Sequence, residues 1–471
     1  MQVLIGFQNH LMIKNQLKSI NPKNNIELSS WDIPSSNDLK HIIKKTARAQ
    51  LNWSEIKLTS RLAQLKNLTQ LLKESCNEMS ILMADEMGKP KKQGIGEISK
   101  CAWLCDYYYK NSEQILSDKH IETEFHKSFI TYRPIGLILG VMPWNFPFWQ
   151  VVRYAIPSLI VGNGVLLKHA SNVQGCANII KDLFVEAGFP KNIFNNLQIP
   201  SSLVSKVIEH DQIQGVAVTG SIIAGKAIAK ISGENLKKTV LELGGNDPYL
   251  ILEDAELNYA VQAVIDGRLL NSGQSCISAK RIIVTKNNIE LFTKKLIDKL
   301  RLKVMGDPHD DVDYGPLVSF SARAEVHKMV ESSIKMGANL CVGGKIPNFE
   351  GAYYPITVLS KVQPGMPAFE EEIFGPVFSI IEAHDNDHAI HLANNSKFGL
   401  GAAVFTSDIS GGKKIAKEKI QAGICFVNDY IKSDPRLPFG GVKMSGYGRE
   451  LSSYGLMEFV NIKSIVVENN N

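Results

Sequence analysis

The spacing of apolar residues changes once along this chain, near Ser128. Before that position, leucines recur three or four residues apart, which predicts helix, and Gly88-Lys89-Pro90 ends the helical pattern that follows. After it, short apolar runs alternate with amphipathic stretches. The pattern therefore predicts a helical first part, followed by an alternation of strands and helices.

The alternation predicts two α/β units. In the first, we expect strands at 134–141, 165–168, 214–219 and 239–243, with helices at 175–188 and 222–231 between them. The rhythm restarts after Gly245, with helices at 257–270, 289–302 and 388–394 and strands at 281–285, 378–383 and 423–428. Strands joined through helices form mostly parallel sheets with helices on both faces, so we predict an α/β fold.

Two alternating stretches, 129–133 and 459–468, fall outside this rhythm. The second has no obvious partner nearby in sequence, and an unpaired strand edge is usually covered, often by another subunit. We expect the two stretches to pair in a small third unit. We also expect a homodimer or a homotetramer.

Composition narrows the possible partners. The 471 residues include 52 basic and 47 acidic ones, for a formal net charge of +5, which predicts no nucleic-acid or membrane partner. No apolar run approaches the roughly 20 residues that span a bilayer. Residues 1–15 lack the pattern of a secretory signal, and the seven irregularly spaced cysteines favour reduced thiols. We therefore expect a cytoplasmic protein.

Cys276 is the first candidate for chemistry. It ends the sequence Asn271-Ser-Gly-Gln-Ser-Cys276, a turn of small polar residues after a predicted helix. Small neighbours let a substrate approach the sulfur and leave backbone N–H groups free to point at it. A nucleophilic cysteine is one interpretation, and an unreactive loop cysteine is the other.

Glu242 and Asn145 both lie at the ends of buried strands. A carboxylate among apolar strand residues costs free energy unless it is paired or neutral, so Glu242 is either a general base with a raised pKa or part of a local cap or salt bridge. Asn145 lies in Met142-Pro-Trp-Asn-Phe-Pro147, a loop stiffened by two prolines. Its amide either stabilises an oxyanion or bonds its own backbone in a tight turn.

A candidate nucleotide site follows the strand at 214–219. Gly220 permits close backbone approach, and the N-terminus of the next helix favours a phosphate. The G-x-G-x-x-G fingerprint does not occur between a strand and a helix anywhere in the chain. Lys168 ends another strand and either binds a ribose or phosphate or is a solvated lysine.

His384, His388 and His391 recur at a spacing compatible with one helix face, beside two aspartates. A zinc site is one interpretation of this cluster. We favour the solvated beginning of a helix, because no other cysteine or histidine flanks it, and we predict no metal.

From about Asn37 to Glu468, the order and spacing of the motifs resemble the aldehyde dehydrogenase superfamily. The resemblance depends on Pro143-Trp-Asn-Phe-Pro147, Lys168, Thr219-Gly-Ser221, Glu242-Leu-Gly-Gly245, Gly273-Gln-Ser-Cys276, Glu371-Glu-Ile-Phe-Gly-Pro-Val377, Pro438-Phe-Gly-Gly-Val-Lys443 and Ser445-Gly446. It implies a Rossmann-type cofactor domain at 1–115 and 135–244, a catalytic α/β domain at 245–440 and a β oligomerisation element at 116–134 and 455–471.

The resemblance also implies roles by position. Cys276 matches the nucleophile that attacks an aldehyde, Asn145 matches the side-chain half of the oxyanion hole, and Glu242 matches the base that activates the deacylating water. Lys168 and Glu372 match ribose-binding groups, Gly220 and Ser221 match the turn that faces the pyrophosphate, and Phe374 matches the residue beside the nicotinamide. The full set of implied cofactor-binding residues is Trp144, Lys168, Ser171, Gly220, Ser221, Glu372 and Phe374.

The substrate is inferred from Arg153. Its position after Pro143-Trp-Asn-Phe-Pro147 matches a substrate-carboxylate arginine, and the wider sequence is similar to the bacterial Sad-type branch of succinate-semialdehyde dehydrogenases. Some relatives have a second arginine where this chain has Leu270. Arg268 or Arg436 is a candidate substitute, and a structural ion pair is the alternative for each.

Three further points stay open in the sequence. Ser171 stands where many NAD-preferring relatives have a glutamate that repels a 2′-phosphate, so the cofactor is NAD or NADP. The substrate is succinic semialdehyde or another small aldehyde. A silent nucleotide-binding relative is the non-enzymatic alternative, because a fold alone does not secure a function.

Overall fold

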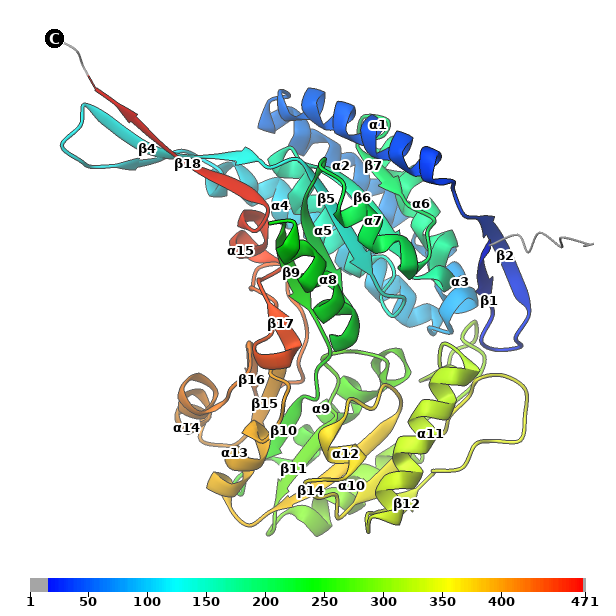
Figure 1. Cartoon of the computed structure of the whole chain (residues 1–471). Helices are drawn as coiled ribbons and strands as arrows, with labels where there is room; N and C mark the ends of the chain where they lie inside the picture. The colour runs from blue at the N-terminus through cyan, green and yellow to red at the C-terminus, as the bar shows by residue number, and fades with distance from the viewer. Residues whose placement is uncertain (1–15, 469–471) are drawn as a thin grey trace, which may run out of the picture.

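The computed structural model describes residues 16–468. Residues 1–15, in which the sequence shows no secretory pattern, lie outside this range. Two α/β bodies lie one above the other, and a narrow arm of strands projects from the upper one (Figure 1). None of the described helices combines the length and apolar character needed to cross a bilayer.

The helical first part predicted from the leucine spacing is present. A hairpin precedes it, and a capping box between Ser35 and Asp38 begins its first helix. Gly88 ends the third helix in a left-handed conformation, with φ of 77°. The elements are β1 (Gln16–Ile20), β2 (Glu27–Asp32), α1 (Ser36–Ser54), α2 (Leu58–Glu74), α3 (Cys76–Met87) and α4 (Lys91–Ile115).

The upper body is built on a six-stranded sheet in the order β17-β9-β8-β5-β6-β7, in which only β17 is antiparallel. Its strands are β5 (Leu137–Met142), β6 (Gly164–His169), β7 (Phe194–Asn196), β8 (Ile213–Thr219), β9 (Lys238–Glu242) and β17 (Gly446–Tyr447). Its helices are α5 (Trp149–Val161), α6 (Gln174–Glu186), α7 (Val204–Ile208) and α8 (Ile222–Glu234). The strands predicted in this unit are confirmed to within three residues.

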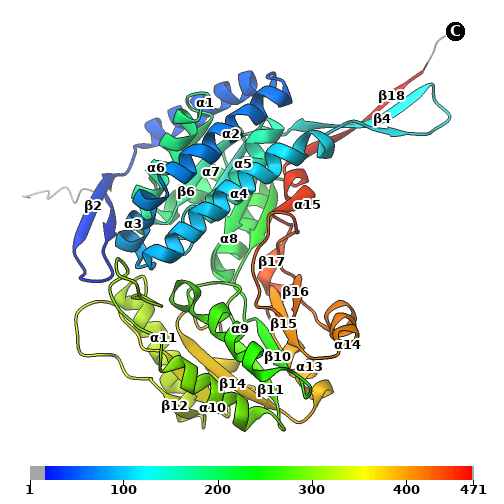
Figure 2. The ribbon, with the colours of Figure 1, turned by 180° about the vertical axis from the view of Figure 1, so that it is seen from behind.

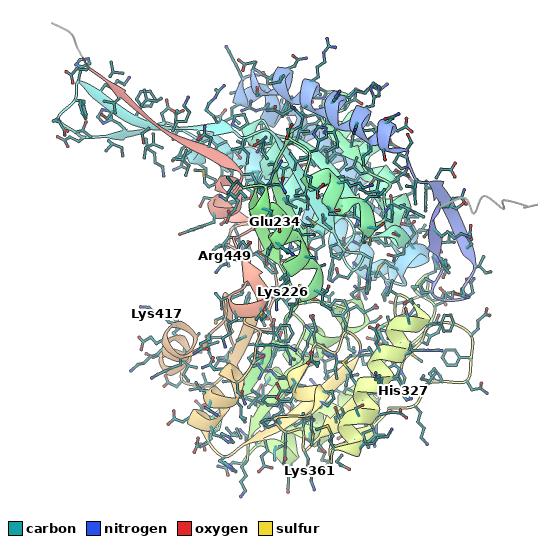
Figure 3. All side chains as sticks on the ribbon, in the orientation of Figure 1. Lys226, Glu234, His327, Lys361, Lys417 and Arg449 are labelled. Carbon is teal, nitrogen blue, oxygen red and sulfur yellow. The ribbon has the colours of Figure 1, made fainter. Side chains whose placement is uncertain are left out.

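Helix α8 shows why these segments are amphipathic. Gly225, Ile228 and Ser232 are buried against the sheet. Lys226 and Glu234 are exposed on its outer side (Figure 3). Burial of the apolar side therefore fixes which face of the helix meets the sheet.

The lower body is built on a seven-stranded sheet in the order β12-β13-β14-β11-β10-β15-β16, in which only β12 is antiparallel. Its strands are β10 (Pro248–Ile251), β11 (Arg281–Thr285), β12 (Asn339–Val342), β13 (Thr357–Ser360), β14 (Val377–Ala383), β15 (Gly401–Phe405) and β16 (Ile424–Val427). Its helices are α9 (Leu257–Leu269), α10 (Ile289–Leu300), α11 (Phe320–Lys335), α12 (Pro367–Glu370), α13 (Asn386–Asn394) and α14 (Ile409–Lys414). The sequence did not predict β10, β12, β13 or β15.

The projecting arm confirms the pairing expected for the tail. Strand β18 (Val460–Val467) runs antiparallel to β4 (Lys127–Pro134), with Ile462 opposite Tyr132, and β3 (Lys119–Ile121) pairs with the other edge of β4. Helix α15 (Ser452–Met457) leads into β18. Seen from behind, the arm again stands clear of both bodies (Figure 2).

The sheet topology positions the site. Strand β5 ends just before the Asn145 loop, β8 ends at Thr219 and β9 ends at Glu242. Because these three strands are parallel neighbours, their carboxyl ends lie at one edge of the sheet, where open α/β sheets bind ligands.

Candidate active site

Cys276 follows a turn with an unusual backbone. Asn271, Ser272 and Gly273 all have positive φ, at 54°, 57° and 79°. A Cβ atom on Gly273 would overlap the carbonyl of Gly375, so glycine is required there. Strained backbone of this kind is typical of functional turns, and here it carries Cys276 into the space between the two bodies.

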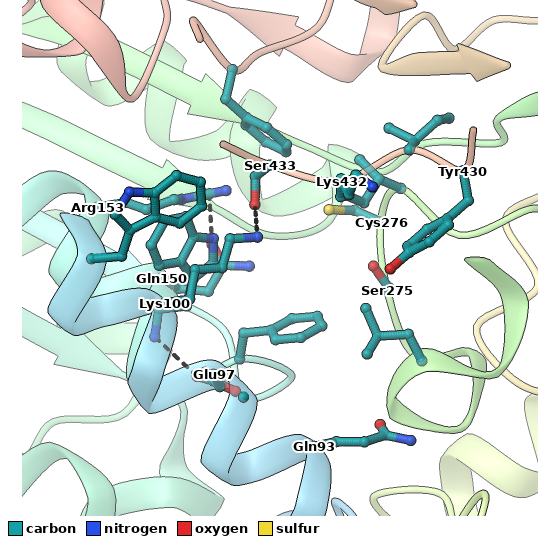
Figure 4. Close-up of a pocket in the computed structure, with 18 residues that line it drawn as sticks. Gln93, Glu97, Lys100, Gln150, Arg153, Ser275, Cys276, Tyr430, Lys432 and Ser433 are labelled. Carbon is teal, nitrogen blue, oxygen red and sulfur yellow. Dashed lines mark hydrogen bonds between the residues drawn. The ribbon is translucent and has the colours of Figure 1, made fainter. Parts of the chain in front are cut away.

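Two cavities meet at Cys276. The sheet-edge cavity is lined by Pro143, Trp144, Asn145, Gln150, Thr219, Gly220, Ser221, Glu242, Leu243, Gly244, Cys276, Glu325, Glu372 and Phe374. The α4–α5 cavity (Figure 4) is lined by Gln93, Gly96, Glu97, Lys100, Trp103, Phe146, Trp149, Gln150, Arg153, Leu270, Ser275, Cys276, Ile277, Tyr430, Ile431, Lys432, Ser433 and Phe439. Cys276 and Gln150 line both, so the sulfur is reached from two sides.

The cysteine sits in a desolvated but cationic setting. Burial raises the pKa of Cys276 to about 12, and the nearby charges of Lys280 and Arg153 oppose that rise. The ammonium of Lys280 donates to the carbonyls of Ser275 at 2.8 Å and Cys276 at 2.6 Å, and lies 3.3 Å from a Glu372 oxygen. Lys280 thus holds the nucleophile turn and favours the thiolate.

Asn145 is buried and aimed at the cysteine turn. Its Nδ2 donates to the carbonyl of Gln274 at 3.1 Å, and its own carbonyl accepts from Nδ2 of Asn271 at 2.8 Å. The alternative of a tight turn bonded to its own backbone is therefore wrong. In the part of the chain that the structure describes, the backbone N–H of Cys276 has no acceptor, so both donors of an oxyanion site lie beside the sulfur.

Glu242 is a buried carboxylate with no compensating partner. It is 2% exposed, and neither of its oxygens has a hydrogen-bond partner in the described structure. Burial, and then the charge of Glu450, raises its pKa well above the ordinary value, while Arg153 and Arg449 oppose the shift. The local cap or salt bridge considered from the sequence is wrong, and a proton-accepting group with a raised pKa remains.

Arg153 lies in the wall of the α4–α5 cavity but is already paired. Its Nε lies 2.7 Å from an oxygen of Glu450, and one of its terminal nitrogens donates to Oε1 of Gln150 at 2.6 Å. The guanidinium also stacks on the Phe439 ring, 4.6 Å from its centre. Arg153 therefore joins the α4–α5 cavity to the Glu242–Glu450 pair.

The sheet-edge cavity fits a dinucleotide. Space is open around the Cα of Gly220, and Ser221 caps α8 by accepting from the N–H of Ala224. A bound pyrophosphate would thus meet the N-terminus of a 13-residue helix. Trp144 and Phe374 pack edge to face, with centres 5.8 Å apart, and offer an aromatic wall for a nicotinamide ring.

Glu372 lies in this cavity too, where it accepts from the N–H of Gly245 at 3.1 Å. Lys168 and Ser171 lie beyond the residues that line it. Lys168 is 5% exposed and donates to Ser201 at 3.3 Å, so the alternative of a solvated strand-end lysine is wrong. Ser171 begins the short helix that follows β6.

Two arginines considered as substrate ligands lie elsewhere. Arg268 is fully buried, and its three nitrogens donate to Val377, Ser278 and Ile373, so it ties α9 to the loop before β14. Arg436 is exposed and forms a salt bridge with Asp434 at 2.6 Å. Neither lines the α4–α5 cavity or the sheet-edge cavity with Cys276. The structural ion pair holds for Arg436, whereas Arg268 is held by hydrogen bonds and forms no ion pair within the described residues.

The histidine cluster shows no metal geometry. The rings of His384 and His388 stack 4.7 Å apart, and His388 accepts from the backbone N–H of His384. Within residues 16–468, no group of three or more histidine, cysteine, aspartate or glutamate side chains is placed to hold a metal. The cluster runs along α13: His384 precedes the Asp385 cap, His388 lies in the first turn and His391 in the last.

Sequence reasoning missed four residues of the site: Gln150, Lys280, Glu450 and Lys100. Lys280 offered one signal, because it and Arg281 are the first charges after Cys276 and follow three small or apolar residues. Glu450 lies in a turn after Arg449, and Lys100 lies in the long helix α4. No local pattern distinguishes either residue.

The sequence matches the aldehyde dehydrogenase family over residues 11–465. The chain belongs to this family. It is 42% identical over 448 residues to Escherichia coli (strain K12) succinate semialdehyde dehydrogenase Sad, an NAD(P)+ enzyme by name, covering 95% of this chain and 97% of that protein. It is 38% identical over 448 residues to Deinococcus radiodurans succinate-semialdehyde dehydrogenase (NADP+), covering 95% and 94%.

The fold agrees with solved structures of the family. Succinic semialdehyde dehydrogenase from Streptococcus pyogenes, in complex with NADP+, superposes with a TM-score of 0.94 at 35% identity, covering 96% of this chain and 100% of that one. The resemblance drawn from the motifs and the predicted α/β fold are therefore confirmed.

Proposed function

We propose that this aldehyde dehydrogenase oxidises succinic semialdehyde to succinate with NAD or NADP. The observation that carries the proposal is that Asn145, Cys276 and Glu242 line one cavity, which meets a second, cation-bearing cavity at the sulfur. The names of the E. coli, D. radiodurans and S. pyogenes relatives support this aldehyde.

The first step is attack by the Cys276 thiolate on the aldehyde carbon. The oxygen becomes an oxyanion, which Nδ2 of Asn145 and the backbone N–H of Cys276 stabilise. Nδ2 carries two hydrogens, and its bond to the carbonyl of Gln274 uses one of them, so the other can donate to the oxyanion. Bound NAD or NADP supplies the hydride acceptor that allows the adduct to become a thioester.

The second step is hydrolysis of the thioester. Glu242 accepts a proton from water, the water oxygen attacks the acyl carbon, and Cys276 leaves as thiolate. Glu450 and Arg153 adjust the proton affinity of Glu242, because one is a like charge and the other an opposite charge in the same buried cluster. The product is a carboxylate.

Cofactor residues follow from the same geometry. We assign the pyrophosphate to the turn at Gly220 and Ser221, the nicotinamide to the wall of Trp144 and Phe374, and a ribose to Glu372. Lys168 and Ser171 are assigned to the adenosine end, just outside the lined cavity. A neutral Ser171 leaves no charge there to repel a 2′-phosphate, which favours use of both cofactors.

We further assign cofactor binding to the upper body, aldehyde chemistry to the lower body and self-association to the arm of β3, β4 and β18. Burial of the arm by a second copy would cover the alternating edge of β18 in a homodimer or homotetramer. A cytoplasmic location accords with cysteines that are all free in the described structure.

The test is an aldehyde panel assayed with both cofactors, comparing native protein with Cys276→Ser. We expect the native protein to show its highest kcat/KM with succinic semialdehyde. The Cys276→Ser variant should lose at least about 10³-fold in kcat, because the hydroxyl is a far weaker nucleophile in this setting. Native-rate turnover by the variant, or the highest kcat/KM with another aldehyde, would contradict the proposal.

A further inference from the structure

Lys100 stands out among the charged side chains of the α4–α5 cavity. Four such side chains line it: Glu97, Lys100, Arg153 and Lys432. Glu97 is paired with Lys89, Arg153 with Glu450 and Lys432 with Asp429. Within residues 16–468, Lys100 alone of the four forms no ion pair, so its ammonium is the uncompensated charge of the cavity.

The structure holds this ammonium at a defined place. Helix α4 presents Gln93, Glu97 and Lys100 to the cavity at successive turns. Nζ of Lys100 donates to Oγ of Ser433 at 2.7 Å and lies 4.8 Å from the centre of the Trp149 ring. Lys100 and Ser433 reach each other across the cavity, and Cys276 lies on the same side as Ser433 (Figure 4).

An unpaired cation in a partly dry cavity favours an anion. The Ser433 hydroxyl already accepts from Lys100, so its own hydrogen is free to donate to a carboxylate oxygen. The ammonium and the hydroxyl together therefore offer two donors to one carboxylate, while the Glu450 carboxylate occupies the Nε side of Arg153.

We propose that Lys100, with Ser433, binds the carboxylate of the aldehyde substrate, in place of the second arginine that Leu270 replaces. The proposal rests on the proposed function and deepens it. Lys100 is then the main determinant of preference for an aldehyde whose far end is a carboxylate, and Arg153 assists from the Glu450 side of the cavity.

The electrostatic surroundings give this interaction a pH dependence. Burial, and then the charge of Arg153, lowers the pKa of Lys100 to about 8, against the attraction of Glu97 and Asp434. Lys432, across the cavity, is occupied by Asp429. The ammonium is therefore present below about pH 8 and is lost above it, so the preference for a carboxylated aldehyde should fall as the pH rises through 8.

The experiment compares succinic semialdehyde with butanal, an uncharged aldehyde of the same carbon number, on the full-length enzyme. We expect Lys100→Met to raise KM for succinic semialdehyde roughly 10- to 100-fold, the range for a lost hydrogen bond to a charged group, and to change KM for butanal less than about 2-fold. Lys100→Arg keeps the charge and should recover most of the loss. Lys92→Met, an exposed lysine of α4 that does not line the cavity, is the matched control and should leave both KM values unchanged.

The main pH measurement uses the native enzyme and so does not depend on the folding of a variant. In the native enzyme, the ratio of kcat/KM for succinic semialdehyde to that for butanal should fall above pH 8, and in Lys100→Arg it should stay level. Using the ratio removes the titration of Cys276 and Glu242, which both aldehydes share. A ratio that is level in the native enzyme overturns the assignment.

Two failures can be told apart. If native enzyme shows no preference for succinic semialdehyde over butanal at pH 7, the proposed function itself fails. If the native enzyme shows the preference and Lys100→Met keeps it, only the assignment to Lys100 is overturned. The same holds if Lys100→Met raises KM for both aldehydes by the same factor.

Discussion

The sheet-edge cavity and the α4–α5 cavity meet at one sulfur, yet the chain builds them differently. The first is formed by loops at the ends of β5, β8 and β9, and its residues lie in short motifs. The second is walled by one face each of α4 and α5 and closed by the loop after β16. In the function proposed above, the first holds the groups that react with every aldehyde, and the second holds the groups that distinguish one aldehyde from another.

This contrast teaches where changes should act. Removing a group from the sheet-edge cavity should lower kcat for all aldehydes alike. Removing one from the α4–α5 cavity should alter the ratio of kcat/KM between aldehydes. Each prediction below tests one side of this division.

The largest effect is expected for Glu242→Gln. Loss of the base should lower the rate of acyl-enzyme hydrolysis about 10²- to 10⁴-fold for every aldehyde, leaving a burst of reduced cofactor in stopped-flow measurements. Because burial and Glu450 raise the pKa of Glu242, the native hydrolysis rate should increase with pH as the carboxyl loses its proton. Two results would contradict this prediction: an effect of Glu242→Gln on one aldehyde only, or a native hydrolysis rate that falls as the pH rises.

The next effect concerns Glu97, which lines the α4–α5 cavity but whose carboxylate also supports the backbone that follows the Asn145 loop, so we expect it to act on the sheet-edge side of the division. One oxygen accepts from the N–H groups of Phe148 and Trp149, each at 2.9 Å, and the other is paired with buried Lys89. Glu97→Gln should destabilise the fold by about 3 kcal/mol, because it leaves a buried ammonium unpaired. Thermal unfolding measures this loss.

A double variant provides the control for Glu97. Lys89→Met combined with Glu97→Gln removes the stranded charge and should recover most of the melting temperature. Activity should fall with all aldehydes alike, since α5 carries the Asn145 loop at its beginning. Equal melting temperatures for the single and double variants would show that the buried pair has no such role.

Arg153→Ala tests the α4–α5 cavity. We expect KM for succinic semialdehyde to rise about 10-fold or more, and KM for butanal to change much less, because a cation is lost from the cavity. Initial-rate kinetics with both aldehydes measure the split. If KM rises by the same factor for both aldehydes, Arg153 does not bind the substrate carboxylate and serves only as the ion-pair partner of Glu450.

The smallest effect is expected for Ser171→Glu. A carboxylate near the adenosine end should repel a 2′-phosphate and lower kcat/KM with NADP about 10-fold relative to NAD. Ser171→Gln, of the same length without the charge, is the matched control. An unchanged cofactor ratio would place the 2′-hydroxyl away from Ser171.

The sequence by itself determined the sheet-edge cavity. Glu242 and Asn145 each occupy a short motif at the end of a strand, and period-two and helical spacing located those strands. Parallel strands bring their carboxyl ends to one edge, so local patterns sufficed to place these two residues together. Cys276 lies in a turn of small residues after α9, and the order and spacing of the motifs linked it to the other two. The pairing of β4 with β18 followed similarly, because both strands alternate and neither had another partner.

Only the tertiary structure decided the α4–α5 cavity and the state of its charges. Lys100 and Ser433 are 333 residues apart, and Arg153 finds Glu450 almost 300 residues on. Whether a charge is paired depends on which side chains packing brings together. The spacing of residues along the chain does not predict those contacts. For the same reason, the sequence left Arg268 and Arg436 open between a substrate ligand and a structural ion pair, until their burial, hydrogen bonds and ion pair were known.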